Sequence, residues 1–127
     1  MTATMGQVMD AIGVQLATIS GLRVYDFPPK SAQAPFAFVD MPETIRYDQT
    51  YGRGSDRMTL QVVVGVASQV DRASRDQISG YADGTVVKAA IEATTLCSCR
   101  VTQVSFGAIQ LAASTFLGAT FEVDVSA

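Results

Sequence analysis

The sequence predicts a single α+β domain, in which helices pack on one face of a mixed or antiparallel sheet of about five strands. The chain has 127 residues, the length of one domain, without a linker, an internal repeat or a low-complexity segment. Apolar residues recur at helical spacing in 4–20 and alternate with polar residues at strand spacing in 57–67 and 115–125. The predicted order of elements is α-β-β-β-α-β-β.

The first predicted element is an amphipathic helix from about Thr4 to Ser20. Thr4 and Gln7 have the spacing of a capping box, and Gly21 suits the position just beyond a helix C-terminus. The apolar residues that share one face of this helix are Met5, Val8, Met9, Ile12, Leu16 and Ile19.

The strands are predicted at 22–27, 35–41, 57–67, 100–111 and 115–125. In the second, Phe36 and Phe38 lie on one side and Ala37, Val39 and Met41 on the other, and Pro42 interrupts the strand. One face of the third strand carries Met58, Leu60, Val62, Val64 and Val66. In the last, the residues predicted to point inward are Leu117, Ala119, Phe121, Val123 and Val125, and those predicted to point outward are Thr120, Glu122 and Asp124.

A second helical region lies between the third and fourth strands. Asp71 is its predicted N-cap, and the helix runs to about Tyr81. Asp83 and Gly84 break it, and a second helical piece follows from 85 to 95. The residues on the apolar face of that piece are Val87, Ala90, Ile91 and Thr94.

The composition argues against several classes of function. Charged residues make up 17% of the chain, below the roughly 25% usual for a soluble domain. Either the protein exposes a small surface or a partner covers part of it, and we favour the partner. The nine Lys and Arg residues are scattered and the net charge is −3, so no basic nucleic-acid footprint is present. We expect neither a signal peptide nor a membrane-spanning helix.

Catalytic signatures are also missing from the sequence. The chain has no His, the commonest general base, and it has neither a nucleophile elbow nor a phosphate-binding P-loop. Gly52 and Gly54 do not make a dinucleotide fingerprint. Cys97 and Cys99 are expected to be ordinary buried or half-buried thiols, because their spacing suits neither a disulfide nor a zinc site. We predict no catalytic residue, no metal and no cofactor.

Two groups of residues remain candidates for function. Paired carboxylates at Asp40 and Glu43, and at Glu122 and Asp124, suit either acid–base or metal chemistry or a solvated surface, and the solvated surface is favoured. The segment 43–57 is rich in Tyr and Arg and contains no Lys, a composition typical of interface hot spots rather than of a simple hairpin tip. The candidate interface residues in this arm are Arg46, Tyr47, Tyr51, Arg53 and Arg57.

The chain resembles the tail-terminator proteins of long-tailed bacteriophages, in particular those of actinobacteriophages. The likeness runs through 21–26, 35–39, 56–64, 71–76, 86–90 and 116–125, and it concerns length, order of elements and local sequence character. It implies a hexameric ring that caps the head-proximal end of the tail tube, stops tube polymerisation and joins the tail to head-completion or neck proteins. The implied location is the virion, after assembly in the host cytoplasm.

The resemblance also implies that double-stranded DNA passes through the lumen of the ring without sequence-specific binding. Six copies with a net charge of −3 would carry −18, and DNA would slide past such a wall because phosphate contacts require cations. We therefore expect some of Asp40, Glu43, Glu122 and Asp124 to face the lumen. Two alternatives stay open: a head-closure or other neck adaptor, and a small α+β ligand-binding domain or enzyme.

Overall fold

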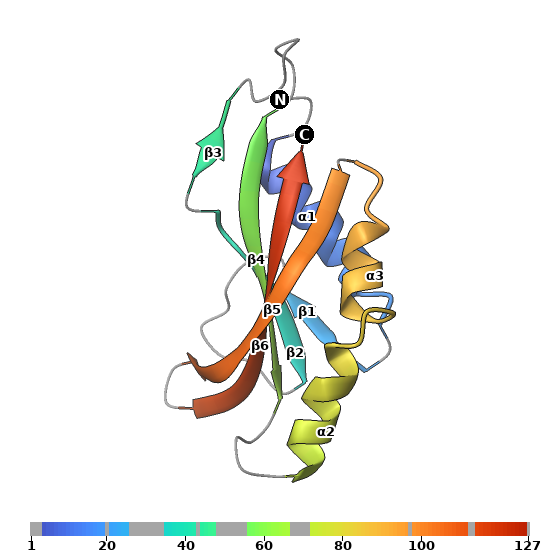
Figure 1. The fold of residues 1–127 in the computed structure, drawn as a ribbon, viewed down its shortest axis with the longest axis vertical. Helices are drawn as coiled ribbons and strands as arrows, with labels where there is room; N and C mark the ends of the chain where they lie inside the picture. The colour runs from blue at the N-terminus through green and yellow to red at the C-terminus, as the bar shows by residue number, and fades with distance from the viewer. Residues whose placement is uncertain are drawn as a thin grey trace.

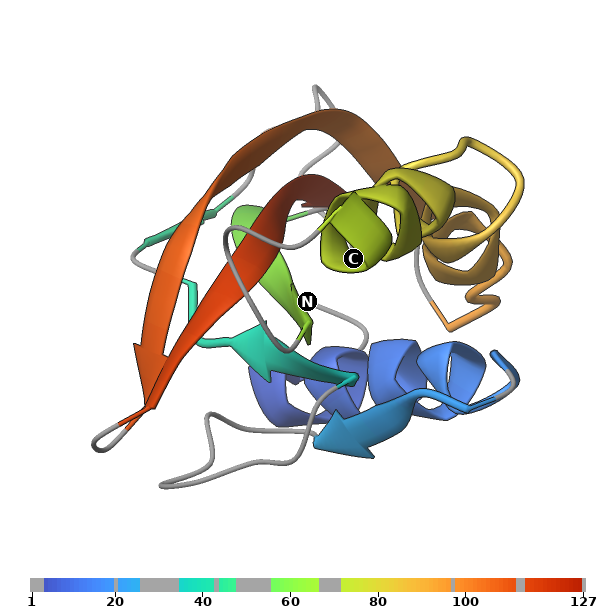
Figure 2. The same cartoon turned by 90° about the horizontal axis from the view of Figure 1, so that it is seen from below.

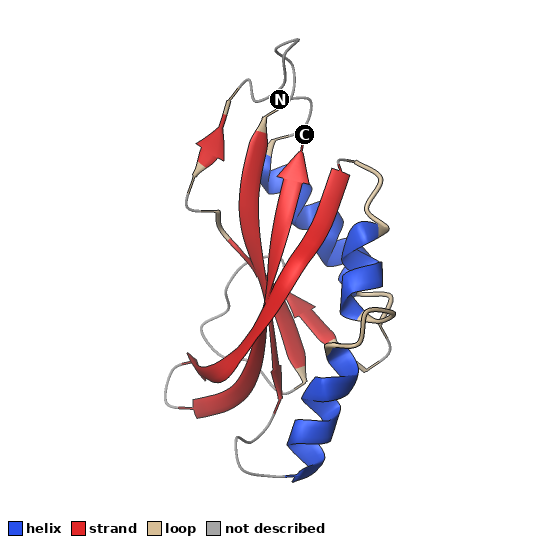
Figure 3. Ribbon diagram, in the orientation of Figure 1, coloured by secondary structure: helices blue, strands red, loops and turns tan. Residues whose placement is uncertain are grey.

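The computed structural model describes residues 4–19, 21–25, 35–42, 44–47, 56–66, 72–96, 98–111 and 114–126. Within these residues, three helices and six strands follow one another in the order α-β-β-β-β-α-α-β-β, which confirms the α+β class (Figure 1, Figure 3). The elements are α1 (Met5–Leu16), β1 (Arg23–Tyr25), β2 (Phe36–Asp40), β3 (Ile45–Arg46), β4 (Arg57–Val66), α2 (Arg72–Tyr81), α3 (Val87–Glu92), β5 (Ser98–Leu111) and β6 (Ser114–Ser126).

All of these strands belong to one mixed sheet. Its order is β1-β2-β4-β6-β5, and the short strand β3 pairs with β4 beyond the end of β2. β1 runs parallel to β2, and every other described pairing is antiparallel. The sheet has one strand more than predicted because two residues of the 43–57 segment, Ile45 and Arg46, pair with Met58 and Arg57.

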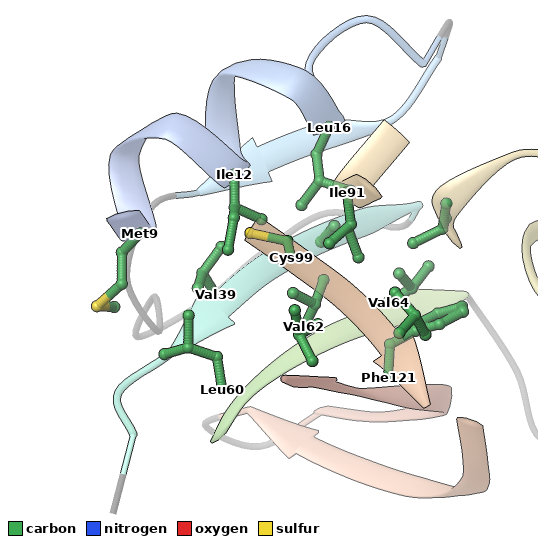
Figure 4. Close-up of a cluster of buried hydrophobic side chains, with 14 of the residues drawn as sticks. Met9, Ile12, Leu16, Val39, Leu60, Val62, Val64, Ile91, Cys99 and Phe121 are labelled. Carbon is green, nitrogen blue, oxygen red and sulfur yellow. The ribbon is translucent and has the colours of Figure 1, made fainter. Parts of the chain in front are cut away.

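The helices cover one face of this sheet. Figure 2 shows the sheet curving around them. The apolar stripe of α1, Ile78 of α2, and Val87 and Ile91 of α3 all pack into the main core. The strands contribute the inward residues that alternation predicts, from Met58 to Val66 and from Ala119 to Val125 (Figure 4). Burial at about 25 cal/mol per Å² of apolar surface makes this core the main stabilising contribution to the fold.

The start of α1 confirms the predicted capping box, but its end differs from the prediction. Gln7 N–H donates to the Thr4 hydroxyl, and the Gln7 side chain accepts from Thr4 N–H. The helix stops at Leu16, and the chain turns through Ala17, Thr18 and Ile19. Gly21 is therefore not the residue that directly follows the helix. The predicted N-cap of the second helical region, Asp71, lies outside the described residues.

Gly21 instead turns the chain from α1 into β1. Leu22 N–H donates to the Ile19 carbonyl over 3.4 Å, and Gly21 has a φ of 79° at the third position of this turn. A type II turn requires a positive φ at that position, which is why glycine is favoured there. The direction change brings β1 alongside β2, so Arg23 pairs with Phe36.

We expect Gly21→Ala to destabilise the protein by about 1–2 kcal/mol, because an L side chain is strained at positive φ. The open space around the site does not relieve that cost, since nothing lies within 4 Å of an added Cβ. Gly80→Ala is the matched control: it lies in α2, its Cβ would also meet nothing within 4 Å, and it should gain about 0.5 kcal/mol of helix propensity. Urea unfolding of both variants checks the opposite signs, and equal stabilities would contradict the turn.

A row of glycines crosses the sheet near the β5–β6 turn. Gly65 of β4 pairs with Gly118 of β6, which pairs with Gly107 of β5. On the face away from the helices, the ring of Phe36 lies over Gly65 and the side chain of Ile109 lies over Gly118. Phe36, Phe38, Val63 and Phe116 form a second apolar cluster there. The cross-strand pair of Phe36 and Gly65 thus lets an aromatic ring lie flat on the backbone.

Candidate functional site

The candidate site is the face of the sheet turned away from the helices, which we call the outer face. Within the described residues, the core-facing side chains of all three helices pack against the opposite face. The half of the outer face near the glycine row carries the second apolar cluster. The other half is polar and charged, because the outward positions of β4 and β6 there are Arg57, Thr59, Gln61, Glu122 and Asp124.

Strand register arranges these polar residues in three rows. The first row runs from Arg46 through Arg57 and Ser126 to Ser98. In the second row, Thr59 pairs with Asp124, which pairs with Arg100; the third row runs from Asp40 through Gln61 and Glu122 to Gln103. We call the six charged residues of these rows the charged strip; its members are Asp40, Arg46, Arg57, Arg100, Glu122 and Asp124.

Two adjoining clefts lie on the charged strip. The first has a volume of about 210 Å³ and is lined by Thr44, Arg46, Arg57, Met58, Thr59 and Asp124. The second, of about 190 Å³, is lined by Arg57, Ser98, Arg100, Asp124, Val125 and Ser126. Arg57 and Asp124 border both clefts. Such small, open and polar depressions suit side chains of a partner better than a buried small molecule, which needs a deeper apolar pocket.

The strip contains charges of both signs that do not pair with each other. Ion pairs between described residues instead join Arg75 to Asp76 and Lys88 to Glu92, on the helices. Two of the three strip carboxylates accept hydrogen bonds from neutral donors. Asp40 Oδ1 accepts from Met41 N–H at 2.9 Å, and Glu122 Oε2 accepts from Gln103 Nε2 at 2.9 Å. Each carboxylate therefore keeps acceptor capacity for a further donor.

The structure brings together residues that the sequence treats as two separate groups. Arg46 and Arg57 of the predicted interface share the outer face with the acidic candidates Asp40, Glu122 and Asp124. Tyr47 follows directly after β3 and its side chain is 68% exposed. The other predicted candidates, Glu43, Tyr51 and Arg53, lie outside the described residues.

Sequence reasoning missed Arg100 as a member of this surface. Arg100 is exposed on β5 and pairs with Asp124 in the strand register, although the two are distant in sequence. Alternation along β5 predicts that Arg100 faces solvent, but it does not predict which residue of β6 pairs with it. A β-bulge between Val101 and Gln103 shifts the register, so the pairing cannot be counted from the β5–β6 turn. Only the pairing with β6 shows which acidic residue lies beside it.

A second polar arrangement, at the end of α3, is structural. The Lys88 ammonium contacts both carboxylate oxygens of Glu92, at 2.7 and 2.8 Å, and Val101 N–H donates to Glu92 Oε2 over 3.1 Å. The hydrogen bonds from Lys88 and then from Val101 lower the pKa of Glu92 below its ordinary value. Glu92 thereby ties α3 to the edge strand β5. Hydrogen bonds from the Thr85 backbone and hydroxyl likewise lower the pKa of Asp83, at the turn before α3.

We expect Glu92 to make stability pH-dependent. Because its folded pKa lies below the unfolded value of 4.5, its contribution is complete above that value and is lost as pH falls through the folded pKa. Urea unfolding should show Glu92→Gln less stable than the wild type at about pH 7, with the difference shrinking as the pH falls well below 4.5. A difference that stayed constant or grew on acidification would contradict this.

The thiol of Cys99 is buried in the core, as expected, and in Figure 4 it lies near Ile12 of α1 and Ile91 of α3. Cys97 lies outside the described residues. Among the residues that the structure describes, no group of three or more His, Cys, Asp and Glu side chains is placed to hold a metal ion. None of the described helices is long and apolar enough to cross a membrane.

Two comparisons with known proteins were negative. No protein-family model matches this chain, and a search of curated proteins returns no match.

Proposed function

We propose that this chain is a structural subunit of a bacteriophage tail, a tail terminator that assembles with copies of itself into a ring. In this proposal six copies cap the head-proximal end of the tail tube, stop its polymerisation and join the tail to the head or neck proteins. Double-stranded DNA passes through the lumen. The work is mechanical, because a closed ring of self-complementary subunits blocks further addition to the tube.

The observation that carries the proposal is the contrast between the two faces of the sheet. One face is covered by helices within the chain, whereas the polar half of the outer face bears exposed Arg46, Arg57 and Asp124 without ion pairs among the described residues. A sheet face that is charged, grooved and free of a helical layer is suited to contact another protein. Arginine is also over-represented at protein interfaces.

The edge strand β5 supports the same proposal. Its 14 residues carry one charge, Arg100, and contain neither Lys nor Pro. Its described protections are the bulge between Val101 and Gln103 and the hydrogen bond from Val101 N–H to Glu92 of α3, and both lie near the start of the strand. Natural edge strands are usually protected from unwanted pairing by charges, by Pro or by a covering element. Phe106 on this strand is 57% exposed. A strand so weakly protected is better suited to a protein that is surrounded by copies of itself than to one that stays alone.

The decisive experiment has two parts, on the purified chain and on the phage that encodes it. Negative-stain imaging with solution-mass measurement should show six-fold rings, and six copies of 13.4 kDa would give about 80 kDa. Deletion of the gene should give tails of uncontrolled length that lack heads. Normal particles after deletion would overturn the proposal, and rings that bind a head protein but not the tube would favour a neck adaptor.

We expect alanine at Tyr47 or at Arg53 to weaken ring formation or tail capping. Tyr and Arg truncations at an interface commonly cost about 2 kcal/mol or more, roughly a thirtyfold loss of affinity. Complementation of the deletion with each variant checks this, with tail length and infectious titre as readouts. The matched control is Tyr25→Ala at the other edge of the sheet, which should leave capping intact provided the protein folds. Normal titres for both arm variants would show that the arm is not the contact.

A further inference from the structure

The charged strip separates its two signs along the strands. Its arginine end consists of Arg46 and Arg57 in the first row, and its carboxylate end consists of Asp40 and Glu122 in the third row. On β4 the first row passes through Arg57 and the third through Gln61, four residues further along the strand. The two ends of the strip are therefore about 13 Å apart. The middle row is balanced, since Asp124 and Arg100 are register partners. The strip therefore holds three cations and three anions.

The arginine end is unfavourable in an isolated chain. Arg46 and Arg57 are direct cross-strand partners, and like charges directly opposite each other destabilise a sheet. Neither forms an ion pair with a described residue. A carboxylate placed over the cleft between them would remove the repulsion, and Thr44 and Thr59 offer hydroxyl donors at its walls. Guanidinium groups bind carboxylates in a bidentate geometry that an ammonium group cannot match.

We propose that the charged strip is a contact between two copies of this chain, in which the arginine end of one copy meets the carboxylate end of the next. This inference rests on the proposed function and deepens it, because it names the surface through which the subunits associate. Asp40 and Glu122 are half-buried and hold neutral hydrogen-bond partners that fix their orientation. They are thus pre-positioned to accept from arginines without a large loss of side-chain entropy.

A second copy fits this surface better than other partners do. Nucleic acid would satisfy the arginines, but its phosphates would be repelled by Asp40, Glu122 and Asp124. An acidic protein would likewise leave the carboxylate end unmatched. In a ring, the arginine end of each copy meets the carboxylate end of one neighbour, and its carboxylate end meets the arginine end of the other neighbour, so each end of the strip contacts the opposite charge. If the charged strip is the contact between copies, Asp40 and Glu122 do not line the lumen of the ring, because residues buried in that contact cannot also face the channel.

The test reverses one charge at each end of the strip. Arg57→Glu and Glu122→Arg should each weaken self-association at least about tenfold by sedimentation equilibrium, since both create like-charge contacts between copies. An equimolar mixture of the two variants should recover an affinity within about threefold of the wild type. In the mixture, the carboxylate introduced by Arg57→Glu in one copy meets the guanidinium introduced by Glu122→Arg in the other. Native mass spectrometry should show assemblies that contain both variants.

The helix α2 supplies matched controls. Arg75→Glu and Asp76→Arg cause the same changes in net charge at exposed positions away from the strip, and neither should alter the affinity. Thermal unfolding by circular dichroism confirms that each variant is folded. Strip variants that associate like the wild type, or a mixture that fails to recover, would overturn the contact. So would a wild-type dissociation constant above about 1 mM.

Each of these results can be separated from failure of the proposed function. Normal tails after gene deletion would refute the terminator role even if the charge reversals behave as expected. Conversely, unregulated tail length after deletion, together with strip variants that still form rings, would retain the terminator role and reject this contact.

Discussion

Gly65→Ala should lower the stability of the protein by about 2–3 kcal/mol and its melting temperature by roughly 10 °C. The added methyl group would overlap the ring of Phe36 and lie 2.6 Å from its Cε1 atom. The ring cannot move away easily, because Phe36 is fully buried. It packs edge-on against Phe116, with centroids 4.9 Å apart, and parallel to Phe38 at 6.2 Å.

The glycine row provides its own controls. Gly107→Ala adds the same methyl group to open space and should be neutral or slightly stabilising, since alanine favours strand backbone over glycine. Gly118→Ala should fall between the two, because it meets Ile109, whose half-buried side chain can rotate. In a double-mutant cycle, Phe36→Leu should relieve part of the loss in Gly65→Ala. Equal melting temperatures for Gly65→Ala and Gly107→Ala would show that Phe36 does not lie over Gly65.

Phe121→Ala should have the largest effect of any single substitution considered for this chain, about 3–5 kcal/mol. Phe121 is 1% exposed, and its register partners are Val62 on β4 and Val104 on β5. Figure 4 shows its ring beside Val64 in the core. A domain of this size is commonly stable by only about 5–15 kcal/mol, so this loss is a large fraction of the free energy of unfolding.

The control for Phe121 is another phenylalanine in the same hairpin. Phe106 on β5 is 57% exposed, so Phe106→Ala removes the same atoms but little buried surface, and should cost less than about 1 kcal/mol. Phe121→Leu should lie between the two because it leaves a smaller cavity. Guanidinium unfolding monitored by circular dichroism would measure all three. A loss for Phe106→Ala as large as that for Phe121→Ala would contradict the placement of the core.

The sequence predicted those features that depend on a local pattern. The alternation in β4 and β6 identified which side chains enter the core, from Met58 to Val125, because a strand buried on one face must alternate. The capping box located the start of α1 because it needs only Thr4 and Gln7. The predicted end of α1 was a few residues too late, since the helix ends at Leu16. Gly21 belongs to the turn that joins Ile19 to Leu22 and not to the helix terminus.

The sequence predicted several members of the candidate site, but it missed Arg100 and did not predict how the members are arranged. The Tyr- and Arg-rich composition of the 43–57 segment indicated Arg46 and Arg57. Two carboxylates close together in the sequence indicated Glu122 and Asp124. Their convergence on one surface depends on β6 lying between β4 and β5, a long-range choice that local spacing does not encode. The pairing of Arg46 with Arg57 also depends on β3, whose two residues are too few to produce a periodic signal.

The central position of β6 has a consequence for biosynthesis. β6 follows β5 in the sequence, yet in the sheet it lies between β4 and β5. The pairing partners of Arg57 and Val66 on β4, which are Ser126 and Leu117, are therefore synthesised after β5. While the ribosome is still making residues 114–126, the edges of β4 and β5 that pair with β6 have no hydrogen-bond partner strand. We therefore expect the sheet to complete only after that segment is translated, and a chain that lacks it to expose unpaired strand edges, which favour aggregation.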